Sequence, residues 1–100
     1  MSFDREHVLR ALRSQREHIE RDYRIRLVGI VGSMARGDAT SGSDIDVMVD
    51  ILDTPSLFQI AEAEEALARA VDLGLPVEFV FREDLKPAMR ARMERDFVPL

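Results

Sequence analysis

The sequence predicts an α+β fold of three strands and three helices. Three short segments carry apolar side chains in alternation or in a buried run, as strands do: residues 24–31, 44–51 and 77–81. Three other segments combine apolar side chains at helical spacing with helix start or stop signals: residues 4–22, 55–73 and those after Pro87. No repeat, low-complexity tract or linker interrupts this pattern, so we expect residues 1–100 to form a single domain.

The first helix and the first strand have clear local signals. Asp4 can cap the helix, and Phe3 and Val8 occupy the two positions of a hydrophobic staple. The apolar stripe of this helix consists of Val8, Leu12 and Ile19. The strand that follows ends at Gly32-Ser33, where Ser33 can cap a short helical turn, and a segment of small and polar residues comes next.

The second strand has one apolar and one acidic face, because successive side chains point to opposite faces of a strand. The apolar face consists of Ile45, Val47, Val49 and Ile51. The acidic face consists of Asp44, Asp46, Met48 and Asp50. We interpret Asp50, like Asp53 beyond the strand, as a solvated surface charge.

Signals at both ends define the second helix. Thr54 can cap it, Pro55 suits its first position and Gly74 can end it. Its apolar stripe consists of Ile60, Leu67 and Val71.

The third strand, VEFVF, is apolar apart from one carboxylate, Glu78. In the last helix we expect three side chains to face inward: Met89, Met93 and Phe97. Three arginines would face solvent or a partner: Arg90, Arg92 and Arg95. The apolar tail FVPL is a second candidate for a partner contact.

Composition excludes several classes of protein. With 46% apolar and 33% charged residues the chain is typical of a folded domain, and its net charge of -5, with a pI near 5.0, argues against direct binding to nucleic acid. There is no cysteine, which excludes disulfides, thiolate metal sites and cysteine nucleophiles. The N-terminus is too charged for a signal peptide, and the longest apolar run, LVGIVG, is too short to span a membrane. We therefore expect a cytoplasmic protein without membrane contact.

Asp44 and Asp46 predict a metal site. Because they lie two residues apart on a strand, their side chains project from the same face, and their Cα atoms are about 6.5 to 7 Å apart. Two ionised carboxylates this close repel, and a divalent ion normally neutralises them; oxygen ligands favour Mg²⁺ or Mn²⁺. Glu78 would complete a set of three carboxylates that supports two metal ions in nucleotidyl transfer, with Glu78 or Asp46 as the base. The alternative is a solvated acidic edge that binds nothing.

The Gly32-Ser33 turn predicts a phosphate site. Glycine admits close approach of the backbone, Ser33 can donate to a phosphate oxygen, and Arg36 can neutralise the leaving pyrophosphate. Neither G-x-x-x-x-G-K-[ST] nor G-x-G-x-x-G is present. The alternative is a tight turn with a capping serine.

Residues 32–46, GSMARGDATSGSDID, read Gly-Ser, ten residues, Asp-x-Asp. This string resembles the signature of the polymerase-β-like nucleotidyltransferase superfamily, and nearly the whole chain is similar to the minimal nucleotidyltransferase antitoxins that pair with HEPN-domain toxins. The resemblance implies a polymerase-β-like fold with a short mixed sheet of about three core strands flanked by helices. It implies that Asp44, Asp46 and Glu78 are catalytic and bind two Mg²⁺ ions. It also implies that Gly32 and Ser33 hold the triphosphate of ATP. In the family the third carboxylate is commonly aspartate, whereas Glu78 is one methylene longer.

The resemblance also implies a function. The chain would be an antitoxin that transfers AMP from ATP to a tyrosine hydroxyl of a cognate HEPN ribonuclease toxin, silencing the toxin within a hetero-oligomer. One alternative is an antitoxin of the same fold that only binds and occludes the toxin. Another is transfer of a nucleotide to a small molecule such as an aminoglycoside, although such enzymes normally carry a second domain for the acceptor.

Overall fold

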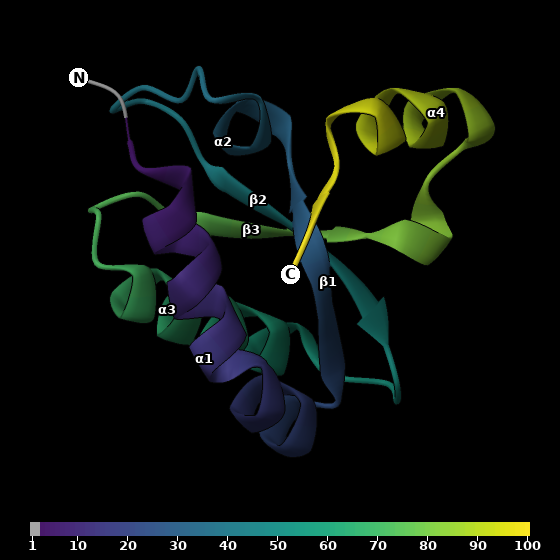
Figure 1. Cartoon of the computed structure of the whole chain (residues 1–100). Coiled ribbons are helices and arrows are strands. Elements are labelled where there is room, and N and C mark those ends of the chain that lie inside the picture. Colours follow the sequence, from purple (N-terminus) through teal and green to yellow (C-terminus); the bar gives the residue numbers. More distant parts are fainter. Residues whose placement is uncertain (1–2) are drawn as a thin grey trace.

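A computed structural model describes residues 3–100 of the chain (Figure 1). In chain order its elements are α1 (Arg5–Tyr23), β1 (Ile25–Val31), α2 (Gly32–Arg36), β2 (Ile45–Ile51), α3 (Leu57–Val71), β3 (Val77–Phe81), the 3₁₀ turn η1 (Arg82–Asp84), α4 (Pro87–Asp96) and β4 (Val98–Pro99). The strand order in the sheet is β3-β2-β1-β4. Strand β1 is antiparallel to β2 and β4, whereas β2 and β3 are parallel, so the sheet is mixed. The predicted α+β class is confirmed, and β4 is an addition to the three predicted strands.

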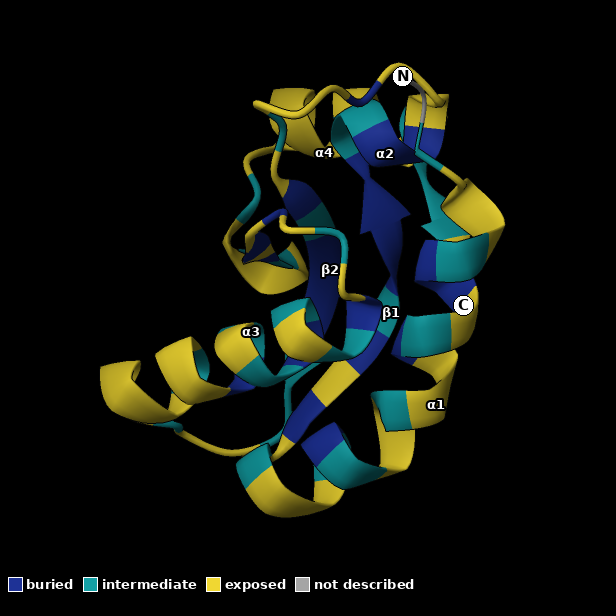
Figure 2. Ribbon diagram, turned by 90° about the vertical axis from the view of Figure 1, so that its left-hand side faces the viewer, coloured by how far each residue is buried: buried dark blue, intermediate teal, exposed yellow. Residues whose placement is uncertain are grey.

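The core lies between the sheet and the two long helices. Helices α1 and α3 pack against each other and against β1 and β3, and they lie together on one side of the sheet (Figure 1). The predicted stripes of α1 and β2 supply much of the core, and β1 and β2 are buried along most of their length (Figure 2). The opposite face of the sheet is covered only in part, by η1 and α4, which contact β2 and β1 respectively. This second face carries the acidic residues of β2.

An irregularity in β1 explains its mixed pattern. The pairing with β2 shifts register between Leu27 and Gly29, which leaves Val28 as the extra residue of a bulge. Leu27 and Ile30 can therefore both contribute to the core, although strict alternation would place them on opposite faces. In the sequence, residues 24–31 alternate between polar and apolar and then become continuously apolar, and the bulge explains this switch.

The structure confirms the start of α1 and corrects both ends of α3. The Asp4 side chain accepts a hydrogen bond from the Glu6 amide, as a cap should. Helix α3 begins two residues later than expected, because Ser56 and Gln59 form a reciprocal capping box that satisfies two amide groups at once. It ends before Gly74, because Asp72 already adopts the left-handed conformation, with φ 57°.

The C-terminal segment also differs from expectation. Met89 is 48% exposed rather than inward-facing, whereas Met93 and Phe97 are half-buried. The apolar tail belongs to the sheet: Val98 pairs with Ile30 and Pro99 with Gly29 of β1. The tail is thus occupied within the chain, whereas the three predicted arginines of α4 are exposed.

Asp50 is not the solvated charge that we expected. The carboxylate of Asp50 accepts a hydrogen bond from Arg82 Nε at 3.0 Å and forms an ion pair with Arg82 Nη2. This contact ties η1 to β2, whereas Asp53 is exposed as expected.

No helix within residues 3–100 combines the length and the apolar character needed to cross a membrane.

Candidate active site

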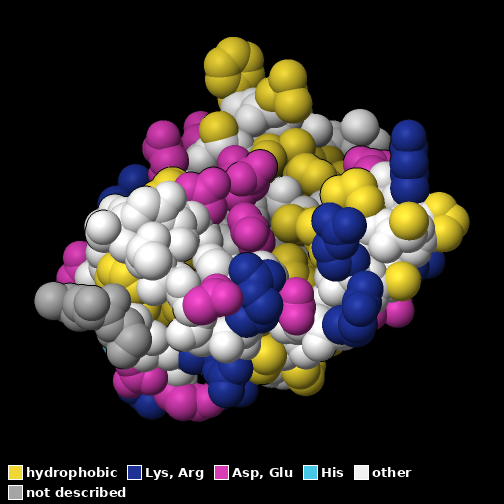
Figure 3. Space-filling model, turned by 90° about the horizontal axis from the view of Figure 1, so that it is seen from above, with side chains coloured by type: hydrophobic (Ala, Val, Ile, Leu, Met, Phe, Trp, Pro, Cys, Tyr) yellow, Lys and Arg dark blue, Asp and Glu magenta, His cyan; other side chains and the backbone are white. Residues whose placement is uncertain are grey.

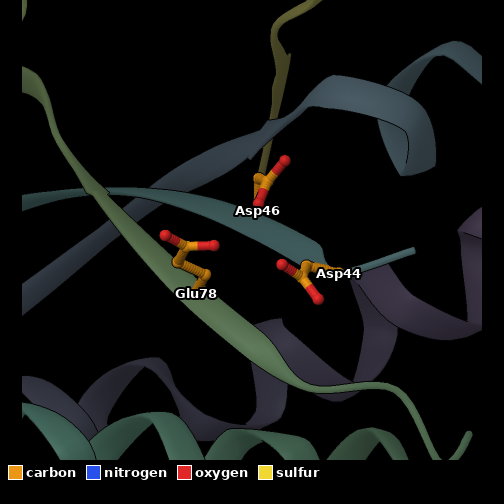
Figure 4. Close-up of side chains that lie close together, drawn as sticks. All are labelled: Asp44, Asp46 and Glu78. Carbon is orange, nitrogen blue, oxygen red and sulfur yellow. The ribbon is translucent and has the colours of Figure 1, made fainter. Parts of the chain in front are cut away.

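Three carboxylates meet on the partly covered face of the sheet. Asp44 directly precedes β2, Asp46 lies in β2, and Glu78 lies in β3. The parallel register places Asp46 opposite Glu78, so these side chains share a face. One oxygen from each of the three carboxylates lies within 4.8 Å of the others (Figure 4). We call these three residues the acidic cluster; the structure brings together the set that the sequence singled out.

Burial and charge act together on Asp46. Its side chain is half-buried, while Asp44 and Glu78 are exposed. Burial raises the pKa of Asp46, and the charges of Glu78 and Asp44 raise it further. Arg36 acts in the opposite direction and lowers it, so its guanidinium lies close enough to influence the acidic cluster. Carboxylates that repel one another in their ionised forms are suited to bind a hard divalent cation, which neutralises the repulsion.

The Gly32 backbone lies directly against the acidic cluster. Antiparallel pairing puts Val31 opposite Asp46, so β1 ends beside the carboxylates. Gly32 has φ +74°, which favours glycine, and a Cβ atom at this position would lie 2.5 Å from Asp46 Oδ2. Glycine at the end of β1 therefore leaves the space that the Asp46 carboxylate occupies.

Ser33 does not cap the turn. Helix α2 begins at Gly32, and among the described residues no side chain caps it. Ser33 lies inside the first turn and is half-buried, so the interpretation as a capping serine is wrong. Its carbonyl accepts hydrogen bonds from the Gly37 and Asp38 amides, which close the turn, and its hydroxyl is not used as a cap.

Arg36 is held by two carboxylates. Its Nε donates to Asp38 Oδ2 at 3.2 Å, and its Nη1 donates to Asp96 Oδ2 at 3.2 Å. Hydrogen bonds to Asp38 and Asp96 raise the pKa of Arg36. The sequence does not reveal the contact with Asp96, because no local pattern links residues 60 positions apart.

The acidic cluster opens onto a broad surface. Viewed from above, acidic side chains gather near the centre of the molecule with a basic group directly beside them, and further basic groups lie to the right, on the side of α4 (Figure 3). Hydrophobic side chains lie between the central acidic side chains and the basic groups on the right. Because Asp44 and Glu78 are exposed, a group carried by a large partner can approach them.

Similar proteins match this chain over most of its length. The family described as the nucleotidyltransferase domain matches residues 12–98. The protein adenylyltransferase MntA of Thermococcus cleftensis is 33% identical over 87 residues, which cover 87% of this chain and 86% of that protein. A solved structure of a protein provisionally named a minimal nucleotidyltransferase superposes with a TM-score of 0.74 at 31% identity, covering 98% of this chain and 97% of that one.

A crystal structure of a toxin–antitoxin with AMP-PNP shares the fold at 21% identity. Its TM-score is 0.64, and the match covers 97% of this chain and 72% of that one. The extent of the domain match, the identity to MntA and the agreement in fold lead to one conclusion: the chain belongs to the nucleotidyltransferase domain family, among the minimal nucleotidyltransferases.

Proposed function

We propose that the chain is the antitoxin of a toxin–antitoxin pair, and that it transfers AMP from ATP to a tyrosine hydroxyl of a cognate HEPN ribonuclease toxin. The observation that carries this proposal is the acidic cluster beside the Gly32 turn on an open face. The relative MntA is named a protein adenylyltransferase, and the fold recurs in a toxin–antitoxin with AMP-PNP. The first supports transfer of a nucleotide to a protein, and the second supports a toxin as that protein.

Asp44, Asp46 and Glu78 would hold Mg²⁺, with two ions bound. When bound, the ions would lower the pKa of the acceptor hydroxyl and stabilise charge on the phosphates. The donors fit this role, because all three are carboxylates and their oxygens lie within 4.8 Å of one another. The extra methylene of Glu78 does not keep its carboxylate away from the other two, which supports an active enzyme over an antitoxin that only occludes the toxin.

The remaining residues would bind and orient the nucleotide. Gly32 leaves room for the phosphates to approach the backbone, the Ser33 hydroxyl would donate to a phosphate oxygen, and Arg36 would face the pyrophosphate. The tyrosine oxygen forms a bond to the α-phosphorus while the bond from that phosphorus to the pyrophosphate oxygen breaks. Asp46 or Glu78 accepts the tyrosine proton, and pyrophosphate leaves.

Intact mass measurement tests the proposal. We would incubate the chain with the candidate HEPN partner, Mg²⁺ and ATP, and expect the partner to gain the mass of one or more AMP units. The double variant Asp44→Ala/Asp46→Ala should add none. Asp53→Ala/Asp84→Ala is a matched control, because it removes two exposed aspartates outside the acidic cluster and should leave the transfer unchanged. Unchanged masses in a stable complex would instead indicate an occluding antitoxin.

A further inference from the structure

Arg36 joins the active-site turn to the C-terminal segment. Its Nε and Nη1 bind carboxylates on opposite sides, Asp38 in the following loop and Asp96 at the end of α4. The Asp96 side chain is 29% exposed and that of Asp38 62% exposed, so Asp96 is the more firmly packed of the two. The remaining nitrogen, Nη2, makes no hydrogen bond within residues 3–100 and is available to a ligand.

The position of Asp96 is fixed by the strand that leads into the site. A Cβ atom at Gly29 would lie 2.4 Å from both the Phe97 ring and the Val98 carbonyl oxygen, so the chain after Asp96 packs directly on the β1 backbone. Val98 pairs with β1, and the Leu100 amide donates to the Val28 carbonyl at 3.1 Å. Strand β1 thus anchors the segment that follows Asp96 and itself ends in the Gly-Ser turn.

Helix α2 depends on such outside contacts. It has five residues and no side-chain cap among the described residues, and a helix this short is unstable alone. Arg5 of α1 donates to the Ala35 carbonyl at 2.6 Å, and Asp96 holds Arg36 from the other direction. Contacts from both ends of the chain therefore fix the turn that carries Gly32, Ser33 and Arg36.

We propose that Asp96 is a positioning residue for the nucleotide: it orients Arg36 so that the free edge of the guanidinium receives the phosphate chain beside the acidic cluster. This inference rests on the proposed function, which assigns Arg36 to the nucleotide. Without the Asp96 carboxylate, only the more exposed Asp38 holds Arg36, so the guanidinium must be ordered further when the nucleotide binds. Ordering one long side chain typically costs about 0.5 to 1.5 kcal/mol, equivalent to a change in affinity of about 2- to 10-fold.

Binding and kinetics of the full chain test this role. By calorimetry with AMP-PNP and Mg²⁺, Asp96→Asn should weaken binding by about 2- to 10-fold. The KM for ATP should rise by the same factor, and kcat should change less than about 2-fold, because the interaction is lost equally in ground and transition states. Asp96→Glu should rescue most of the affinity. The control Asp84→Asn removes an exposed carboxylate of η1 and should bind like the wild type.

A double-mutant cycle separates positioning from a purely structural effect. In an Arg36→Ala background, Asp96→Asn should weaken binding no further, because the group that it orients is gone. Additive losses, or undiminished binding by Asp96→Asn, would overturn the role of Asp96. If Asp96→Asn does not fold, Arg36→Lys tests the contact between the same two side chains from the arginine. The affinity of Arg36→Lys for AMP-PNP should fall by a similar factor. A wild-type chain that binds no AMP-PNP would overturn the proposed function itself.

Discussion

At the scale of single residues, Asp46 trades stability for function. Burial and two neighbouring carboxylates raise the pKa of this side chain, so its ionised form destabilises the folded chain at neutral pH. Asp46→Asn should therefore stabilise the metal-free protein in thermal unfolding. We expect a gain below about 1 kcal/mol, because the side chain is only half-buried and water screens the repulsion.

The pH dependence of this gain has a definite sign. In the folded chain Asp46 binds its proton more tightly than in the unfolded chain, so stability falls as the pH rises from the ordinary aspartate pKa to the raised value. The advantage of Asp46→Asn should be complete at neutral pH and should vanish on acidification below the ordinary aspartate range. A gain that is the same at both pH values would contradict this explanation.

Gly32 combines an unusual backbone conformation with a close contact. Gly32→Ala should destabilise the fold by about 1 to 2 kcal/mol, because an alanine resists positive φ. Its methyl group should also displace the Asp46 carboxylate, which lies 2.5 Å from the Cβ position, and so reduce AMP transfer.

Gly74→Ala is the matched control for this substitution. Gly74 has φ +71°, almost the value of Gly32, but nothing lies within 4 Å of its Cβ position. The two variants should lose similar stability in denaturant unfolding, and only Gly32→Ala should lose activity. Equal activity would show that the space beside Asp46 is unimportant.

At the scale of elements, the start of α3 provides a direct comparison of two caps. Ser56→Ala removes the capping box with Gln59 and should cost about 0.5 to 2 kcal/mol in chemical unfolding. Thr54→Ala removes the cap that the sequence suggested, and should cost less than about 0.5 kcal/mol because Thr54 lies outside the helix. The opposite order would mean that α3 begins at Pro55 in solution.

These two caps also show where prediction from sequence ends. Periodicity identified α1, β1, β2, α3 and β3, since each buries a continuous face. The predicted start of α3 was wrong because Thr54-Pro55 and Ser56-x-x-Gln59 are competing start signals, and the reciprocal capping box of Ser56 and Gln59 decides between them. Strand β4 has two residues, too few for any pattern, and it forms where Phe97 and Val98 pack on the bare backbone of Gly29.

The same distinction applies to the candidate site. Asp44 and Asp46 were predictable as neighbours because strand geometry alone places them on one face. Glu78 was added to them as a third carboxylate on the same sheet face, and the parallel register of β2 and β3 places it opposite Asp46. The pairing of Arg36 with Asp96 could not be predicted, because it depends on how the C-terminal segment packs on β1.

At the scale of the whole molecule, one face of the sheet supplies stability and the other supplies chemistry. Helices α1 and α3 cover the apolar face, where side chains such as Leu12, Val47 and Leu67 are fully buried. The other face leaves the acidic cluster open within a chain of net charge -5. A cation that neutralises this cluster should therefore stabilise the entire fold, because it binds the folded state and not the unfolded state.

Magnesium should reveal this linkage in thermal unfolding without any nucleotide or partner. The melting temperature of the wild type should rise with Mg²⁺, by an amount equivalent to about 2.7 kcal/mol at a concentration 100-fold above Kd. Asp44→Ala/Asp46→Ala should melt at a temperature that Mg²⁺ does not raise, because two of the three clustered carboxylates are gone. NaCl at matched ionic strength controls for screening of the net charge. An equal rise in the double variant would place the cation elsewhere and leave the acidic cluster without a metal.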